Sequence, residues 1–447
     1  MEDKRYLKLH NYFGYALGGF GQCFVLIFAN FILLFMTDTI GMNVGIVGTL
    51  MMVSKVFDGI SDILFGTLLD KTHTKMGKAR PWILWTAIPL GIAQLLLFFI
   101  PQKESFMQYA YFFIAYCMLN AVFYTANGVA YNSLSATLTK NQVERIKMGV
   151  VLTFSVLIGS ILISSATIGM VSSFGGGVKG WRVVALAYTI GVIVCEIICA
   201  LSIKEVGYND DDTTPEPFHN LTFVQSVKYL LGSKYYLLIL AYYILYYFSN
   251  GVFGAVGIYY CIHALHNESL YGLLSAATMV PMILGVVFTP ALVKKYGMYK
   301  TNTVSLLLSA ASCIFLVLGG YAKIFPILIA GLILKSLFFG PMSGSVNAII
   351  AEISNYETLR SGVHLEGIMY SCVSLGQKLG GGLASAITGW MLSLAHYNGT
   401  LTTQPASANQ MIQFLYLILP SVCAIFLYML IKKIDVWSAI DKLMEKA

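Results

Sequence analysis

The stretch Lys55-Val56-Phe57-Asp58-Gly59-Ile60-Ser61-Asp62 places three ionisable side chains inside an apolar segment that runs over residues 43–69. Lys55, Asp58 and Asp62 are spaced three and four residues apart, so a helix presents them on one face. In a membrane-spanning helix each such group costs about 2.5–3.5 kcal/mol. Two carboxylates and an amine at that cost predict a coupling-ion or proton site, with a structural ion cluster between helices as the alternative.

The composition points to a membrane protein along the whole chain. Of the 447 residues, 57% are hydrophobic and only 11% are charged, whereas soluble proteins have about 25% charged residues. One soluble core cannot bury this surplus, so we expect an all-α, multi-pass membrane protein whose partner is the lipid bilayer. The net charge of +7 is assigned to basic loops and not to nucleic-acid binding.

Twelve apolar segments have about the 20 residues that a membrane span needs. They form two groups of six, which predict an N-terminal six-helix bundle (1–203), a cytoplasmic middle loop (204–234), a C-terminal six-helix bundle (235–433) and a cytoplasmic tail (434–447). The predicted spans are residues 11–37, 43–69, 82–100, 106–134, 147–172, 180–202, 235–262, 268–292, 302–320, 324–350, 363–394 and 409–432.

Loop charges predict that both termini are cytoplasmic. With that orientation the outer loops hold few of the 28 Lys and Arg residues, because cytoplasmic loops of membrane proteins are enriched in cations. The four in outer loops are Lys103, Lys179, Arg182 and Lys323.

The two halves carry a similar basic loop after their second span. Residues 70–80 and residues 293–300 each place a glycine, Gly77 or Gly297, among lysines and arginines. Two six-helix groups with matching loops suggest parallel repeats. This organisation resembles the major facilitator superfamily, whose members hold substrate between the halves and rock around it.

A few other polar residues fall within predicted spans. Lys378 is followed by three glycines and needs an anionic partner, for which the carboxylates of the second span are the candidates; a lysine reaching the membrane interface is the alternative. Glu196 and Lys335 each stand alone in a span, so that a cavity-lining role and a structural role both stay open. Tyr124, Tyr131 and Asn132 could stack on and hydrogen-bond a ring-shaped polar ligand, or could serve in packing.

The eight cysteines lie in or beside apolar stretches without C-x-x-C spacing, which favours small buried thiols over disulfides or metal ligands. The chain has no P-loop, dinucleotide-binding fingerprint, H-E-x-x-H motif or nucleophile elbow. We therefore expect no enzyme activity, no cofactor, no catalytic residue, and no metal beyond a possible Na⁺ at Asp58 and Asp62. Uphill transport would have to draw on an ion gradient.

Several motifs together resemble the glycoside–pentoside–hexuronide:cation symporter family, of which the melibiose carrier is a member. The resemblance runs through the whole chain. It is carried by Thr37-Asp38-Thr39-Ile40-Gly41, Gly45-Ile46-Val47-Gly48-Thr49-Leu50, Asp58-Gly59-Ile60-Ser61-Asp62, Gly77-Lys78-Ala79-Arg80-Pro81-Trp82-Ile83-Leu84, Tyr124-Thr125, Ser133-Leu134, Ala351-Glu352-Ile353-Ser354-Asn355-Tyr356-Glu357, Gly362-Val363-His364-Leu365-Glu366-Gly367 and Lys378.

The resemblance implies coupled transport of a sugar or glycoside with Na⁺, H⁺ or Li⁺. It assigns cation-site positions to Asp58, Ser61, Asp62 and Thr125, with Lys378 beside them. It also assigns two gating loops, one after the second span and one after the tenth span. Those loop positions are Gly77, Lys78, Arg80, Tyr356, Glu357 and Glu366.

The sugar-binding positions depart from the family pattern. Acidic positions of the melibiose carrier fall near Gln22 and at Gly128, its aromatic position at Asn132 and its arginine at Thr153. Neutral hydrogen bonding would then replace carboxylates, which gives a predicted substrate site of Gln22, Tyr124, Asn127, Tyr131, Asn132 and Lys378.

The sequence therefore predicts an alternating-access symporter for a sugar, glycoside or uronide, driven by Na⁺ or H⁺. The missing carboxylates motivate one alternative, a cation-coupled transporter of an amphipathic solute such as a lysolipid or steroid conjugate. The second alternative, which ranks last, is a sensor that keeps the fold but does not transport.

Overall fold

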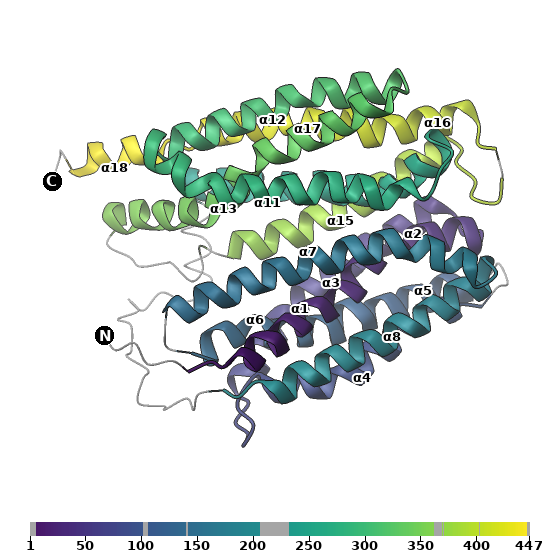
Figure 1. Cartoon of the computed structure of the whole chain (residues 1–447), viewed down its shortest axis with the longest axis horizontal. Helices are drawn as coiled ribbons and strands as arrows, with labels where there is room; N and C mark the ends of the chain where they lie inside the picture. Colours follow the sequence, from purple (N-terminus) through teal and green to yellow (C-terminus); the bar gives the residue numbers. More distant parts are fainter. Residues whose placement is uncertain are drawn as a thin grey trace. The chain divides into compact units, whose positions relative to one another are not determined.

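A computed structural model describes residues 6–101, 106–139, 142–205, 232–361, 369, 371–401 and 403–444. The regular structure of these residues is helical (Figure 1), and short π-helical or 3-10 segments, labelled η, join several of the α-helices. By contacts between residues the chain divides into two compact units.

Unit 1 consists of Met1–Thr213, Asn267–Gly272 and Gly389–Pro405. Within it α1 packs against α7 and α8, and α4 packs against α6 and α8. Its helical elements are α1 (Leu9–Ala29), α2 (Ile32–Leu34), η1 (Phe35–Thr39), α3 (Val44–Asp70), α4 (Arg80–Leu96), η2 (Leu97–Phe99), α5 (Phe106–Cys117), η3 (Met118–Tyr124), α6 (Thr125–Thr137), α7 (Gln142–Ser173) and α8 (Gly177–Ser202).

Unit 2 consists of Thr214–His266, Leu273–Thr388 and Ala406–Ala447, so that α11 begins and α15 ends within unit 1. In unit 2, α12 packs along α13, and α17 packs against α10 and α12. The helical elements are α10 (Lys234–Tyr259), η5 (Tyr260–Ala264), α11 (Leu270–Tyr296), α12 (Met298–Tyr321), α13 (Phe325–Ser361), α15 (Ser371–Leu394), α16 (Ala406–Gln413), η6 (Phe414–Ile418), α17 (Leu419–Lys432) and α18 (Val436–Met444).

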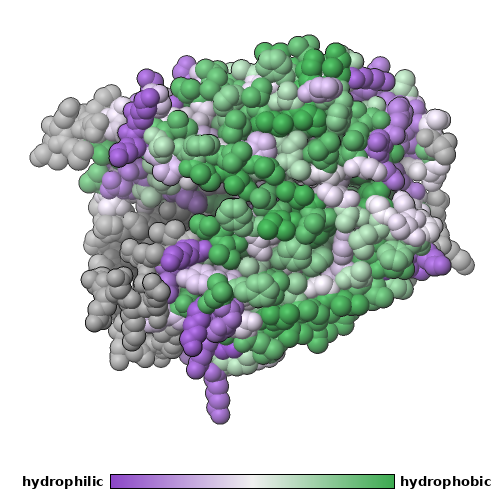
Figure 2. Space-filling view, in the orientation of Figure 1, coloured by the Kyte–Doolittle hydropathy of each residue, from purple (hydrophilic) through white to green (hydrophobic). Residues whose placement is uncertain are grey.

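Ten helical stretches of the described residues are long and apolar enough to cross a membrane. Figure 2 shows hydrophobic side chains over the flanks of the helices and hydrophilic ones near helix ends. On α4, Trp85, Ile88 and Ile92 are each about half-exposed and follow helical spacing. Such a stripe is stable in lipid, where a helix also satisfies its own backbone hydrogen bonds. The predicted all-α membrane fold is confirmed.

Local sequence signals set the helix starts. Asn43 caps α3, since its side-chain oxygen accepts hydrogen bonds from the backbone N–H groups of Gly45 and Ile46 at 2.9 and 3.2 Å. Pro81 stands in the first turn of α4, where its missing N–H costs nothing. These caps fix where the functional helices begin.

The two basic loops share one backbone feature. Gly77 has a φ of +109° before α4, and Gly297 has a φ of +79° before α12. This left-handed region is readily open only to glycine. The loops differ in length, since residues 71–79 separate α3 from α4 whereas Gly297 alone separates α11 from α12.

One predicted loop is partly helical. Residues 351–361 were expected to follow the tenth span as a loop, but α13 continues to Ser361. The reason is an apolar face: Ile349, Ile350 and Ile353 are buried in the core of unit 2, and Tyr356 packs against that core. Val436 and Ile440 join the same core, which explains why the predicted tail forms α18.

Candidate cation and substrate site

Asp58 of α3 is a buried carboxylate held by a residue from another helix. Only 7% of its surface is exposed. Its Oδ1 accepts a hydrogen bond from the Thr125 hydroxyl at 2.5 Å. The same hydroxyl lies 2.9 Å from the carbonyl oxygen of Asn120, five residues earlier in the π-helical segment η3. This π-helical turn, a feature common at functional sites, positions Thr125 against α3.

Lys55 supplies the positive charge at this carboxylate. Its Nζ lies 3.4 Å from Asp58 Oδ2, with the two side chains 26% and 10% exposed. A partly buried ion pair of this kind is costly to break on one side only, because the remaining charge loses its compensation. The Lys55 side chain therefore offsets the charge of Asp58 in this structure.

The other two predicted cation-site residues lie on α3 nearby. The Ser61 hydroxyl donates to the backbone carbonyl of Asp58 at 3.0 Å, and Asp62 is half-buried four residues after Asp58. Among the described residues no group of three or more His, Cys, Asp or Glu could hold a metal ion. The oxygens of Asp58 and Thr125 suit a hard monovalent cation or a proton.

Asn127 is the centre of a polar network that joins four helices of unit 1. Its Nδ2 donates to Thr86 of α4 at 3.2 Å and to Glu196 of α8 at 3.3 Å. Its Oδ1 accepts from Gln22 of α1 at 3.3 Å. Asn127 and Glu196 are fully buried. The network therefore brings together two predicted substrate residues, Gln22 and Asn127, with a carboxyl group between the helices.

The remaining predicted substrate residues of unit 1 have different surroundings. Tyr131 is 1% exposed, stacks on Tyr15 with ring centroids 4.9 Å apart, and donates to the Tyr15 carbonyl at 2.6 Å. In this structure its contacts are those of a core residue. Tyr124 is half-buried and Asn132 is exposed. Their roles in binding stay predictions.

Glu205, a residue that the sequence did not single out, holds the predicted gating loop before α4. Its carboxylate accepts hydrogen bonds from the backbone N–H groups of Lys78, Ala79 and Arg80 at 2.8–2.9 Å. These groups are the free donors at the start of a helix, where a negative charge is favourable. The signal available in sequence was a lone acid just after the sixth span, but its partner lies more than 120 residues away.

A second buried carboxylate ties α13 to the start of α10. Glu357 is 1% exposed and accepts a hydrogen bond from Ser233, the N-cap of α10, at 2.5 Å. Arg360 lies 3.7 Å from its other oxygen, and the Tyr356 ring packs edge-on against Tyr235. Two predicted gating residues thus lie on a helix; Glu366, the third, lies outside the described residues.

The predicted site residue of unit 2, Lys378, lies on α15 and is half-buried. Its pairing with the carboxylates of α3 stays a prediction. Lys335 of α13 lies 4.9 Å from the centre of the Phe253 ring, a cation–π contact. That ring stacks on Tyr416.

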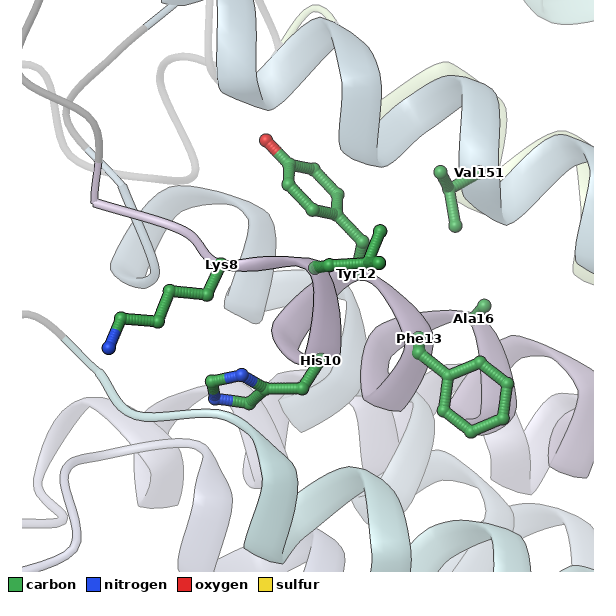
Figure 3. Close-up of a pocket in the computed structure, with 7 residues that line it drawn as sticks. Lys8, His10, Tyr12, Phe13, Ala16 and Val151 are labelled. Atoms are coloured by element: carbon green, nitrogen blue, oxygen red, sulfur yellow. The ribbon is translucent and has the colours of Figure 1, made fainter.

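A surface groove of about 800 Å³ lies at the start of α1. Figure 3 shows Lys8 and His10 pointing away from Val151 of α7, while Tyr12 and Phe13 line the groove's apolar part. None of the predicted site residues lines this groove. We therefore do not place the substrate there.

An all-α membrane fold in two units, with a buried carboxylate held between a lysine and a threonine, defines a membrane transporter. The chain belongs to the family described as MFS/sugar transport protein, whose profile matches residues 14–435. The predicted family resemblance is confirmed. Membership also makes the chain a transporter and not an enzyme.

Relatives match along most of their length. The isoprimeverose transporter of Lactiplantibacillus pentosus is 28% identical over 92% of this chain and 85% of its own. The putative glycoside/cation symporter YagG of Escherichia coli (strain K12) is 28% identical over 93% and 89%. The solved structure of a bacterial homologue of the human lysosomal transporter Spinster has a TM-score of 0.65 at 14% identity and covers 96% of both chains, which supports the fold alone.

Proposed function

We propose that this chain is a secondary symporter that couples uptake of a sugar, glycoside or uronide to a monovalent cation by alternating access. The observation that carries the proposal is the buried Asp58 carboxylate, held by Thr125 of a different helix at 2.5 Å. Binding a cation or proton there changes the charge that links α3 to α6. Family membership and the names of the relatives support a sugar as cargo.

The coupling ion is Na⁺ or H⁺, with Li⁺ as a possible substitute for Na⁺. Each unit charge that crosses the membrane with the sugar contributes about 2.3 kcal/mol per 100 mV. That energy is sufficient for accumulation without ATP. The carboxylate and hydroxyl oxygens at Asp58 can take either ion.

The substrate is held by neutral polar groups in unit 1. Gln22 and Asn127 form one amide pair at 3.3 Å, and amides both donate to and accept from sugar hydroxyls. Gly128 leaves open space where an added Cβ would meet no atom within 4 Å. The position therefore offers space but no carboxylate, so the amides of Gln22 and Asn127 are the polar groups proposed to bind the substrate.

We propose that both termini lie in the cytoplasm. Lys78 and Arg80 of the loop before α4, and Lys294 and Lys295 at the end of α11, then lie on the cytoplasmic side. This agrees with the enrichment of cations in cytoplasmic loops. Sugar and cation would enter from the opposite side.

Counterflow in proteoliposomes tests the function. Proteoliposomes that contain the purified protein are loaded with unlabelled isoprimeverose, a β-glucuronide or a lysolipid. Uptake of the labelled compound is then measured with and without Na⁺ or a pH gradient. We expect sugar or glucuronide exchange, and gradient-driven accumulation that Asp58→Asn abolishes while exchange persists. Asp435→Asn at the start of α18 is the matched control, because asparagine also caps helices well. Full accumulation by Asp58→Asn, or exchange of the lysolipid alone, would contradict the proposal.

A further inference from the structure

Glu196 of α8 is a carboxyl group that the predicted cation site does not use. The residue is 0% exposed. Its Oε2 accepts one long hydrogen bond, 3.3 Å, from Asn127, and its Oε1 has no hydrogen-bond partner among the residues that the structure describes. Buried polar groups are normally hydrogen-bonded, so an acid with one free oxygen calls for a functional explanation.

The groups around Glu196 bring no compensating charge to it. Asn127 of α6 donates to it, and the same amide bonds Gln22 of α1 and Thr86 of α4; all three are neutral polar side chains. Neither ion pair observed between described side chains involves Glu196. The titratable groups that interact with it electrostatically are neutral phenols and thiols: Tyr124 of η3, Tyr131 of α6, and Cys195 and Cys199 of α8.

Charged residues on the other elements packed against α8 lie at helix ends or act elsewhere. Arg80, at the start of α4, donates to the Ala200 carbonyl, one turn beyond Glu196, and its charge is shared with Glu205. Lys147 lies near the start of α7, and Asp38 lies in η1. The described part of η2 carries no ionisable side chain. The environment of Glu196 is therefore uncharged on the sides that its oxygens face.

An unpaired carboxylate in such a place would cost several kcal/mol, so the group holds a proton in this conformation. Close packing keeps it there. A Cβ added to Gly21 of α1 would lie 3.1 Å from Oε1 and 2.9 Å from Cys195 Cβ, so α1 packs closely against α8 beside this oxygen. A displacement of α1 from α8 would expose Oε1 to solvent.

Glu196 is also linked to the proposed substrate residues. Asn127 donates a hydrogen bond to its carboxyl, and the oxygen of the same amide accepts one from Gln22. A sugar hydroxyl that competes for either amide would alter the bond between Asn127 and Glu196. Substrate binding and protonation must then affect each other by the same factor.

We propose that Glu196 is a proton-binding site, separate from Asp58, that takes up and releases one proton in each transport cycle. This rests on the proposed symport and makes H⁺ a coupling ion. In the release step the O–H bond of the acid breaks, the electron pair stays on the carboxylate, and a water molecule that enters between α1 and α8 accepts the proton.

The test compares wild type with Glu196→Gln, which keeps the shape and mimics the neutral acid. The first readout needs no substrate: infrared difference spectra between pH 6 and pH 9 report the C=O band of a buried carboxylic acid. We expect Glu196→Gln to lose a wild-type band, and Glu268→Gln, at an exposed position between α10 and α11, to keep it. A spectrum unchanged by Glu196→Gln would overturn the proposal.

The second readout is proton movement with a trapped pH-sensitive dye in proteoliposomes, using isoprimeverose and a β-glucuronide as probes. We expect sugar-driven H⁺ uptake to fall at least tenfold in Glu196→Gln while sugar exchange continues. Sugar-driven H⁺ uptake at the wild-type rate would refute the proton site but leave symport intact. If the wild-type protein transports neither sugar, the proposed function fails. The infrared band then remains as the test of whether Glu196 binds a proton.

Discussion

The hydroxyl of Tyr397 lies 2.8 and 2.9 Å from the two carboxylate oxygens of Asp38, although 359 residues separate them in the chain. Both belong to unit 1, because Gly389–Pro405 packs with the first part of the chain. The Thr37 hydroxyl also donates to Asp38 at 2.6 Å. Nearby, Trp390 donates to the Thr49 hydroxyl at 2.8 Å. These bonds attach the segment after α15 to η1 and α3.

We predict that Tyr397→Phe destabilises unit 1 by about 1.5–3 kcal/mol, the typical value of a hydrogen bond to a charged group. The ring remains, so packing is preserved and only the hydroxyl is lost. Thermal unfolding in detergent measures the effect as a lower Tm. Tyr321→Phe, at an exposed position of α12, should leave Tm unchanged. Equal Tm values for Tyr397→Phe and wild type would show that the contact does not stabilise the fold.

Asp38 also predicts a pH dependence of stability. Burial raises the pKa of the Asp38 carboxyl from 3.8 to about 6, while hydrogen bonds from Thr37 and Tyr397 lower it. A raised pKa means that the folded protein binds more protons than the unfolded chain between these values. The stability contribution of this group therefore decreases as pH rises through that window, and stays low above about pH 6.

Asp38→Asn should remove this dependence. We expect the Tm of wild type relative to that of Asp38→Asn to fall between pH 3.8 and about pH 6, because other titrating groups are shared by the two proteins and cancel. Parallel Tm curves over this range would contradict the assignment.

Gly77 and Gly297 provide a matched pair of positions for testing the predicted gating loop before α4. Both have a positive φ, so alanine strains either position by about 1 kcal/mol. At Gly77 a Cβ would also overlap the carboxyl of Glu205, whereas at Gly297 it meets no atom within 4 Å. We predict that Gly77→Ala costs at least about 1 kcal/mol more than Gly297→Ala, since it disturbs the carboxylate that caps α4. Chemical unfolding measures both, and similar losses would argue against the Glu205 contact.

Thr125→Val tests the hydroxyl that holds Asp58. Valine keeps the shape of threonine and removes the oxygen 2.5 Å from the carboxylate. We expect the half-saturating cation concentration in counterflow to rise about tenfold or more, which corresponds to about 1.4 kcal/mol. Thr303→Val, whose hydroxyl bonds only its own helix in α12, is the control. An unchanged cation dependence would remove Thr125 from the site.

The sequence predicted the helical membrane fold well because apolar length alone demands it. In lipid a backbone must satisfy its own hydrogen bonds, so each long apolar segment has to be a helix. The basic loops around Gly77 and Gly297 each contain a glycine with positive φ, although the two loops differ in length. The sequence was less informative at residues 351–361, where the end of the tenth apolar span and the family resemblance suggested a loop although one face of the helix is buried.

Asp58 was evident from sequence alone, since an acid in an apolar segment is costly wherever the helix lies. Its geometry was not evident. Thr125 is 67 residues from Asp58 in the chain, and only the packing of α3 against η3 and α6 brings the two together. Three further contacts also join residues that lie far apart in the chain. They are Glu205 with the start of α4, Tyr397 with Asp38, and Asn127 with Glu196. Hydropathy and charge are properties of single positions, so the sequence by itself determined the helical membrane fold and the presence of a carboxylate, Asp58, within an apolar segment. Hydrogen bonds between distant positions depend on how helices pack, so only the tertiary structure decided which partners hold each carboxylate, and which acid is left with an unpaired oxygen.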